Sequence, residues 1–128
     1  MAAVTAAKAG RRICASGELV EGGTGHRFSV RRRGEVLPAF AIRFQGKVHA
    51  YINRCTHQGV ELDWGDGRFF DRQGTHLICT THGARYHPAT GACTGGRCAG
   101  IGLTVLAVEE GGGSVYLSAV DGLNLVKE

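Results

Sequence analysis

Two cysteine–histidine pairs constrain this chain more than any other feature of its sequence. Cys55 is followed by His57, and Cys79 is followed by His82, so the spacings are C-x-H and C-x-x-H. Thiolate sulfur and imidazole nitrogen are good ligands for zinc and iron. Two such pairs with a connecting segment between them predict one metal site, to which each of two loops contributes a cysteine and a histidine.

The mixed ligand set favours a 2Fe–2S cluster, with Cys55 and Cys79 on one iron and His57 and His82 on the other. With two cysteinates and two neutral imidazoles the oxidised cluster has no net charge, whereas four cysteinates give a dianion. A neutral cluster is easier to reduce, so we expect a potential above that of all-cysteine ferredoxins. A structural Cys₂His₂ zinc site is the competing interpretation, although zinc sites usually have other spacings.

The segments before the first loop alternate between apolar and polar side chains, which is typical of half-buried β-strands. Phe40, Ile42 and Phe44 fall on one face of such a strand. Gln45-Gly46 is a two-residue turn signal, so we predict a hairpin of residues 37–44 with 47–53.

Strand signals return after the second loop, in the apolar run 103–108 and the alternating run 114–119, and no segment carries a helical stripe. We therefore predict an all-β fold that forms a single domain over residues 1–128. Its sandwich or barrel base comprises residues 11–53 and 101–126, and a small cluster-binding subdomain, residues 54–100, is inserted between them.

The formal net charge is +4, and the densest basic run is Arg31-Arg32-Arg33. We interpret this run as the solvated end of a strand, because no aromatic interleaving or helix-turn-helix pattern supports nucleic-acid binding. A basic surface could still steer an acidic electron-transfer partner. No apolar run approaches the roughly 20 residues of a membrane span, so we expect no membrane partner.

We expect a cytoplasmic location, because no apolar signal region follows Arg11-Arg12. Thiols stay reduced there, so the five cysteines are interpreted as ligands or free thiols. Cys93 and Cys98 are expected as free thiols packed under the loop, with a small disulfide or a second metal site as alternatives. Cys14 is expected to be buried in a strand.

The run NRCTHQGVEL at 53–62 resembles the first loop of Rieske ferredoxins, and CTTHGARY at 79–86 resembles the second. The resemblance continues through 88–91 and Leu103. It implies a Rieske-like all-β fold and electron delivery to a partner oxygenase or reductase. It also implies a 2Fe–2S cluster, whose ligands would be Cys55, His57, Cys79 and His82.

This chain departs from the Rieske proteins of respiratory complexes, which carry an extra cysteine in each loop and join the two in a disulfide. Val60 and Thr81 occupy the matching positions here. Ala84 replaces a serine that bonds a bridging sulfide, while Tyr86 matches a tyrosine that donates to a ligand cysteine's sulfur. Hydrogen bonds to the sulfurs stabilise the reduced cluster. Because one of two is lost, we expect a potential in the lower part of the Rieske range.

The chain lacks the G-x-G-x-x-G fingerprint of nicotinamide and flavin sites. We therefore expect an electron-transfer component and no enzyme activity of its own. It would carry single electrons from a reductase to a terminal oxygenase, with His57 and His82 at the exit. The alternatives are a small Rieske-like subunit of a reductase, such as a nitrite reductase, and a zinc-stabilised interaction module.

Overall fold

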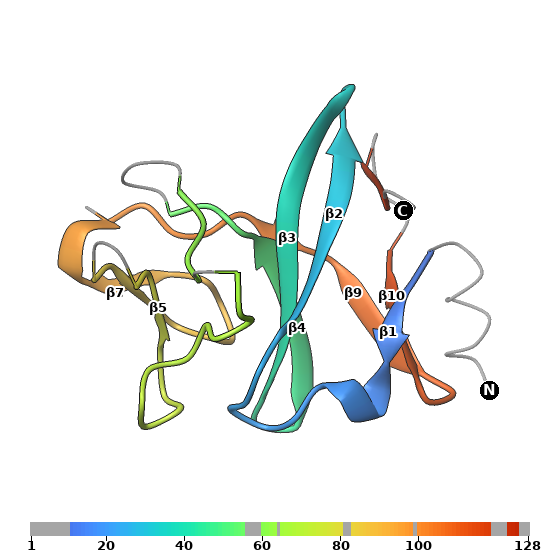
Figure 1. The fold of residues 1–128 in the computed structure, drawn as a ribbon, viewed down its shortest axis with the longest axis horizontal. Coiled ribbons are helices and arrows are strands. Elements are labelled where there is room, and N and C mark those ends of the chain that lie inside the picture. The colour runs from blue at the N-terminus through green and yellow to red at the C-terminus, as the bar shows by residue number, and fades with distance from the viewer. Residues whose placement is uncertain are drawn as a thin grey trace.

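A computed structural model gives the fold of the chain, and it describes residues 11–55, 60–63, 65–80, 83–98, 100–118 and 123–125. The described part consists of β-strands and two short 3₁₀ helices, η1 (Ser16–Glu18) and η2 (Gly96–Cys98), so the all-β prediction is confirmed (Figure 1). The strands are β1 (Arg11–Ala15), β2 (His26–Arg32), β3 (Glu35–Phe44), β4 (Lys47–Ile52), β5 (Leu77–Ile78), β6 (Arg85–Tyr86), β7 (Cys93–Gly95), β8 (Val105–Leu106), β9 (Val108–Gly111), β10 (Ser114–Leu117) and β11 (Leu123–Leu125).

The strands form three antiparallel sheets. A five-stranded sheet has the order β11-β2-β3-β4-β8, and a three-stranded sheet has the order β1-β10-β9. The third sheet, β5-β6-β7, is short and lies to one side of the five-stranded sheet in Figure 1. No helix in the described part of the chain is long and apolar enough to cross a membrane.

The predicted hairpin is confirmed, since β3 pairs with β4 and Phe44 lies opposite Lys47. Its turn residues Gln45 and Gly46 have positive φ values of 53° and 80°. Positive φ at both central positions matches the twist of the flanking strands. The preceding hairpin, β2–β3, turns in the same way at Arg33 and Gly34, with φ values of 51° and 81°. The arginine run thus occupies the end of β2 and the turn, as expected for a strand end.

Strand β3 is buried on both faces, although its alternating pattern predicts one exposed face. Ala39 and Ala41 belong to a core that lies between the first two sheets. Phe40 and Ile42 point the other way and belong to a second core, which also contains buried residues of the later chain such as Leu62, Leu77 and Leu103. The segment that follows β4 therefore folds back over the outer face of the β3–β4 hairpin.

Two strands are shorter than their sequence patterns predict. Residues 75–80 also carry a strand pattern, and only Leu77–Ile78 of that run form a strand, β5. The apolar run 103–108 is divided between β8 and β9. The chain bends at residues 65–67, where the Arg68 N–H donates to the Asp66 side chain at 3.1 Å, and turns again where the Gly74 N–H donates to the Asp71 carbonyl at 3.0 Å. Between these turns Phe69 is buried, and its ring stacks on Phe40 at a centroid distance of 3.9 Å.

Gly25 lies where β2 approaches the second core, and the contact leaves no room for a side chain. A Cβ at Gly25 would come within 2.8 Å of the Ala41 carbonyl oxygen and of the Phe69 ring. We expect Gly25→Ala to lower the free energy of unfolding by about 1–3 kcal/mol, because overpacking forces backbone shifts. Gly17→Ala is the control, since a Cβ there meets nothing within 4 Å. Urea unfolding checks this, and equal stabilities for the two variants would contradict it.

Candidate metal centre

The structure brings together the two predicted cysteine ligands. Cys55 follows β4 and Cys79 follows β5, and both are buried in the second core. Leu62 is buried in the same core. The predicted ligands His57 and His82 lie outside the described residues, and they stay predictions.

Backbone hydrogen bonds close each loop at its cysteine. The Cys55 N–H donates to the Val60 carbonyl at 2.5 Å, and the Cys79 N–H donates to the Ala84 carbonyl at 2.9 Å. The Gly83 N–H returns to the Cys79 carbonyl at 2.7 Å. Each cysteine therefore stands at the start of a loop whose two ends are hydrogen-bonded to each other.

Thr80 connects the two loops directly. Its backbone N–H and its hydroxyl both donate to the carbonyl of Leu62, at 2.9 and 2.8 Å. Because Thr80 follows one cysteine ligand and Leu62 ends the other loop's segment, these bonds fix the spacing of the loops. A cluster bound by both loops requires them to lie close together, and the protein's own hydrogen bonds hold Thr80 next to Leu62.

A buried polar network anchors the first loop. Asn53 is fully buried, and its side chain accepts from the Leu62 N–H at 2.8 Å and donates to Asp63 at 3.1 Å. Asp63 also accepts from the Gly67 N–H at 2.9 Å and pairs with Arg27 at 3.1 Å. A buried carboxylate with this many partners is stabilised. The network therefore ties both ends of the loop to strand β2.

The sequence did not identify Arg27, which also pairs with Glu61. It precedes Asp63 by a long stretch of chain, and it shows only the ordinary alternation of strand β2. The pairing of β2 with β3 brings Arg27 to the first ligand loop. No local motif could have revealed that contact.

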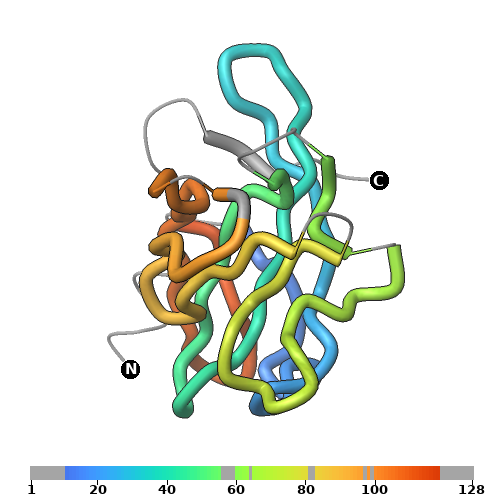
Figure 2. Tube along the Cα trace, turned by 90° about the vertical axis from the view of Figure 1, so that its left-hand side faces the viewer, coloured from blue at the N-terminus to red at the C-terminus, as the bar shows by residue number. Residues whose placement is uncertain are grey.

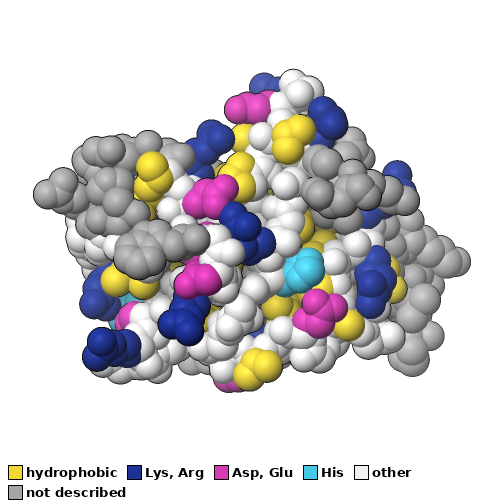
Figure 3. Space-filling model, in the orientation of Figure 1, with side chains coloured by type: hydrophobic (Ala, Val, Ile, Leu, Met, Phe, Trp, Pro, Cys, Tyr) yellow, Lys and Arg dark blue, Asp and Glu magenta, His cyan; other side chains and the backbone are white. Residues whose placement is uncertain are grey.

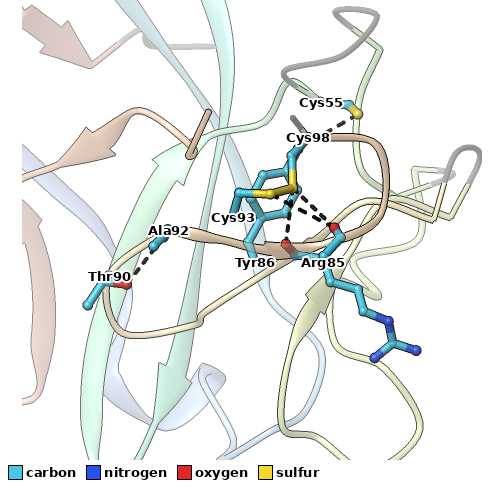
Figure 4. Close-up of a disulfide and its surroundings, with 8 residues drawn as sticks. Cys55, Arg85, Tyr86, Thr90, Ala92, Cys93 and Cys98 are labelled. Atoms are coloured by element: carbon cyan, nitrogen blue, oxygen red, sulfur yellow. Dashed lines mark hydrogen bonds between the residues drawn. A yellow bond between two sulfur atoms is a disulfide. The ribbon is translucent and has the colours of Figure 1, made fainter. Parts of the chain in front are cut away.

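Tyr86 faces the site as the resemblance implies. It is fully buried, and its hydroxyl donates to Cys55 Sγ at 3.8 Å (Figure 4). A second buried tyrosine, Tyr51, instead donates to the Pro88 carbonyl at 2.6 Å, and burial raises the pKa of its phenol. Of these two buried hydroxyls, it is that of Tyr86 which reaches a predicted ligand sulfur.

The expectation of free thiols at Cys93 and Cys98 is wrong, because the two form a disulfide (Figure 4). Strand β7 and the turn after it bring their Cα atoms to 5.8 Å, which is within disulfide range. The turn presses against the second ligand loop, since a Cβ at Gly96 would lie 2.4 Å from the Gly83 carbonyl oxygen. The reducing compartment assumed from the sequence had argued against this bond.

The remaining cysteine, Cys14, lies in β1 and is buried in the first core, as expected. Burial, assisted by the nearby carboxylate of Glu18, raises the pKa of its thiol to about 11. It therefore stays protonated and unreactive at neutral pH. Cys14 lies in a different core from Cys55 and Cys79.

The described residues fit the predicted cluster. Two buried cysteines begin the two ligand loops, a tyrosine hydroxyl donates to the sulfur of Cys55, and both cysteines lie in an apolar core. Thiolates in such surroundings suit an iron–sulfur cluster, whose potential depends on burial and on hydrogen bonds to sulfur. The described part of the chain holds no group of three or more metal-ligating side chains, and the two expected imidazoles lie outside it.

Residues 11–106 match the family model of the Rieske [2Fe-2S] domain. The chain belongs to this family. Its cofactor is therefore a 2Fe–2S cluster, as the paired ligands predict. The matched range spans both ligand loops and most of the β-strands, from β1 to β8.

Individual proteins that are similar to this chain support the same family assignment. The oxidoreductase NdmD of Pseudomonas putida is 41% identical over 49 residues, which is 38% of this chain and 8% of that protein. One chain in a complex of reduced oxygenase and oxidised ferredoxin of carbazole 1,9a-dioxygenase has a TM-score of 0.69 and 26% identity, covering 94% of this chain and 98% of that one. The ferredoxin of carbazole 1,9a-dioxygenase from Nocardioides aromaticivorans IC177 shares the fold, with a TM-score of 0.66 at 22% identity over 85% and 96% of the two chains.

Replacing Tyr86 tests its contact with Cys55. We expect Tyr86→Phe to keep the cluster and to lower the reduction potential by roughly 30–60 mV, because a hydrogen bond to sulfur stabilises the reduced form and a tenfold change in equilibrium equals about 59 mV for one electron. Tyr51→Phe is the matched control, as it removes a buried hydroxyl that bonds a backbone carbonyl. Redox titration followed by EPR checks this, and equal shifts in both variants would refute it.

Removing the disulfide should weaken the fold. We expect Cys93→Ala/Cys98→Ala to lower the free energy of unfolding by about 2 kcal/mol, which is the magnitude for a short closed loop. Dithiothreitol should lower the stability of the wild type by a similar amount and leave that of the double variant unchanged. Urea unfolding with and without the reductant measures both effects. A wild type that is insensitive to the reductant, with two further cysteines open to alkylation, would contradict the bond.

Proposed function

We propose that this protein is a one-electron carrier whose Rieske 2Fe–2S cluster is held by Cys55, His57, Cys79 and His82. The single observation that carries the proposal is the convergence of Cys55, Cys79 and the Tyr86 hydroxyl in one buried core. The cluster, when bound, supplies a site that gains and loses one electron. The four ligands follow from the paired motif, two of them in described residues.

The chain's own residues would support that role in three ways. The Tyr86 hydroxyl favours the reduced form through its bond to Cys55. Leu62 and Phe69, both fully buried, exclude water from the core around the cysteines. The bonds from Thr80 to Leu62 hold the loops at a fixed spacing. A rigid surrounding favours rapid electron transfer, since little rearrangement accompanies each change of charge.

The partners we propose are a reductase, as electron donor, and a terminal oxygenase, as acceptor. The support is the similarity in fold and sequence to a chain from a carbazole dioxygenase oxygenase–ferredoxin complex, which this chain covers almost completely. The chain itself is then an electron-transfer component and no enzyme. The cytoplasmic location stays a prediction, and the Cys93–Cys98 disulfide is a bond uncommon in that compartment.

A second candidate is a Rieske subunit or domain of a larger oxidoreductase. The observation in its favour is the match to NdmD, of which this chain spans only 8%. A reductase subunit, such as that of a nitrite reductase, belongs to the same class. A purified chain that accepts electrons from a separate reductase supports the carrier. Electron transfer only within an isolated complex supports the subunit.

Replacing single cysteines with alanine tests which of them bind the cluster. We expect Cys55→Ala and Cys79→Ala to abolish the visible absorption and the EPR signal of the reduced protein, because each removes a thiolate ligand. Cys14→Ala is the control, since it removes a buried cysteine from the other core and should keep the full signal. Iron, sulfide and zinc analysis accompanies the spectra. A colourless wild type with one bound zinc would establish the zinc-stabilised module instead.

A further inference from the structure

Four arginines at one end of the molecule make no ion pair or side-chain hydrogen bond with any described residue. Arg31 and Arg32 end strand β2, Arg33 lies in the turn, and Arg54 follows β4. We call these four residues the arginine face. In Figures 1 and 2 the β2–β3 hairpin projects beyond the rest of the fold, and Figure 3 shows dark blue side chains at its tip.

Three other arginines in the described part of the chain serve the fold itself. Arg27, Arg43 and Arg85 each pair with a carboxylate from another segment of the chain, so these pairs link separate parts of the fold. Arg43 shows the contrast best, because it binds Glu110 at 2.6 Å and the Leu19 carbonyl at 2.8 Å. Arginines that hold the fold are thus paired internally, whereas those of the arginine face are left available to another molecule.

The arginine face borders a groove that reaches the metal centre. The groove has a volume of about 270 Å³, and Arg32, Arg54 and Cys55 are among its lining residues. Leu37 and Ile52 give it an apolar floor, and Glu35 is its one acidic lining residue in the described part of the chain. An anion bound between the two guanidinium groups would therefore lie beside a predicted cluster ligand.

Apolar side chains accompany the charges. Val36 lies directly opposite Arg31 in the hairpin and is 48% exposed, and Val60 at the end of the first ligand loop is 38% exposed. Protein interfaces combine an apolar centre with a polar rim and are enriched in arginine. Guanidinium groups bind carboxylates through two parallel hydrogen bonds. The chemistry of this end of the molecule matches a protein surface that carries carboxylates.

We propose that the arginine face and its groove form the docking surface for an acidic redox partner, whose carboxylates bind Arg32 and Arg54 next to Cys55. This inference rests on the proposed electron-transfer function. The charges would steer the partner and hold its cofactor near the cluster while one electron leaves the reduced protein and enters the partner. Nucleic acid fits less well, because none of the described residues that line the groove is aromatic and Glu35 would repel phosphate.

The test uses the reduced, cluster-loaded full chain and two small oxidants of opposite charge. Ferricyanide, a trianion, takes one electron to become ferrocyanide, and tris(phenanthroline)cobalt(III), a trication, takes one electron to become cobalt(II). We compare Arg32→Glu/Arg54→Glu with Arg11→Glu/Arg72→Glu. Both double variants change the net charge equally, and all four side chains lack a charged partner among the described residues.

We expect the Arg32/Arg54 variant to react about tenfold more slowly with ferricyanide at low salt, and no more slowly with the cobalt complex. The Arg11/Arg72 variant should stay within about twofold of the wild type, and the difference should vanish near 0.5 M salt. Poly-L-glutamate should slow the reaction of the wild type with ferricyanide, and slow that of the Arg32/Arg54 variant less. If Arg32/Arg54 replacement lowers cluster loading, Arg31→Glu/Arg33→Glu at the hairpin tip serves in its place.

The outcomes separate this proposal from the proposed function. Equal rates for the two double variants, with the cluster intact, would overturn the docking surface while leaving the electron carrier in place. Duplex DNA that stays bound at micromolar affinity in 0.15 M salt would also overturn it, in favour of a nucleic-acid partner. A protein that assembles no redox-active cluster would overturn the proposed function itself, which visible and EPR spectra show before any rate is measured.

Discussion

The burial of strand β3 on both faces is the constraint on which the rest of the structure depends. One face closes the sandwich core through Ala39 and Ala41, and the other supports the second core through Phe40 and Ile42. The third sheet, which lies on the other side of this second core, is too small to be stable alone, because β5, β6 and β7 have only two or three residues each. Cys55 and Cys79 are therefore positioned by a rigid hairpin of the base, whose side chains share their core.

Polar contacts orient the backbone of the segments that this apolar packing supports. Hydrophobic packing holds the loops against β3 without fixing where each backbone group points. The bonds of Asn53, Asp63 and Thr80 supply the missing geometry, since each binds a backbone group of the segment that follows the first loop, at Leu62 or Gly67. Tyr86 belongs to both systems, as its ring lies in the core and its hydroxyl reaches Cys55. The site is thus built by packing and then oriented by hydrogen bonds.

Local features of the sequence were predictable, and long-range contacts were not. The β3–β4 hairpin followed from alternation and from Gln45-Gly46, because both signals act within a few residues. The cofactor followed from ligand chemistry. The second buried face of β3 and the pairing of Arg27 with Asp63 depend on chain segments far apart in sequence. The Cys93–Cys98 bond was missed for another reason, since an assumption about compartment outweighed the Gly95-Gly96 turn between the cysteines.

The arginines show how one residue type can serve the fold and recognition separately. A guanidinium that is mostly buried is stabilised by a carboxylate partner, because an unpaired charge is costly to remove from water. Arg43, with a side chain only 17% exposed, has such a partner. Arg31 and Arg33 are exposed and gain nothing for the fold from a partner. Their charge therefore contributes little to the stability of the fold. Its main physical effect is on charged molecules that approach the metal centre from the arginine face.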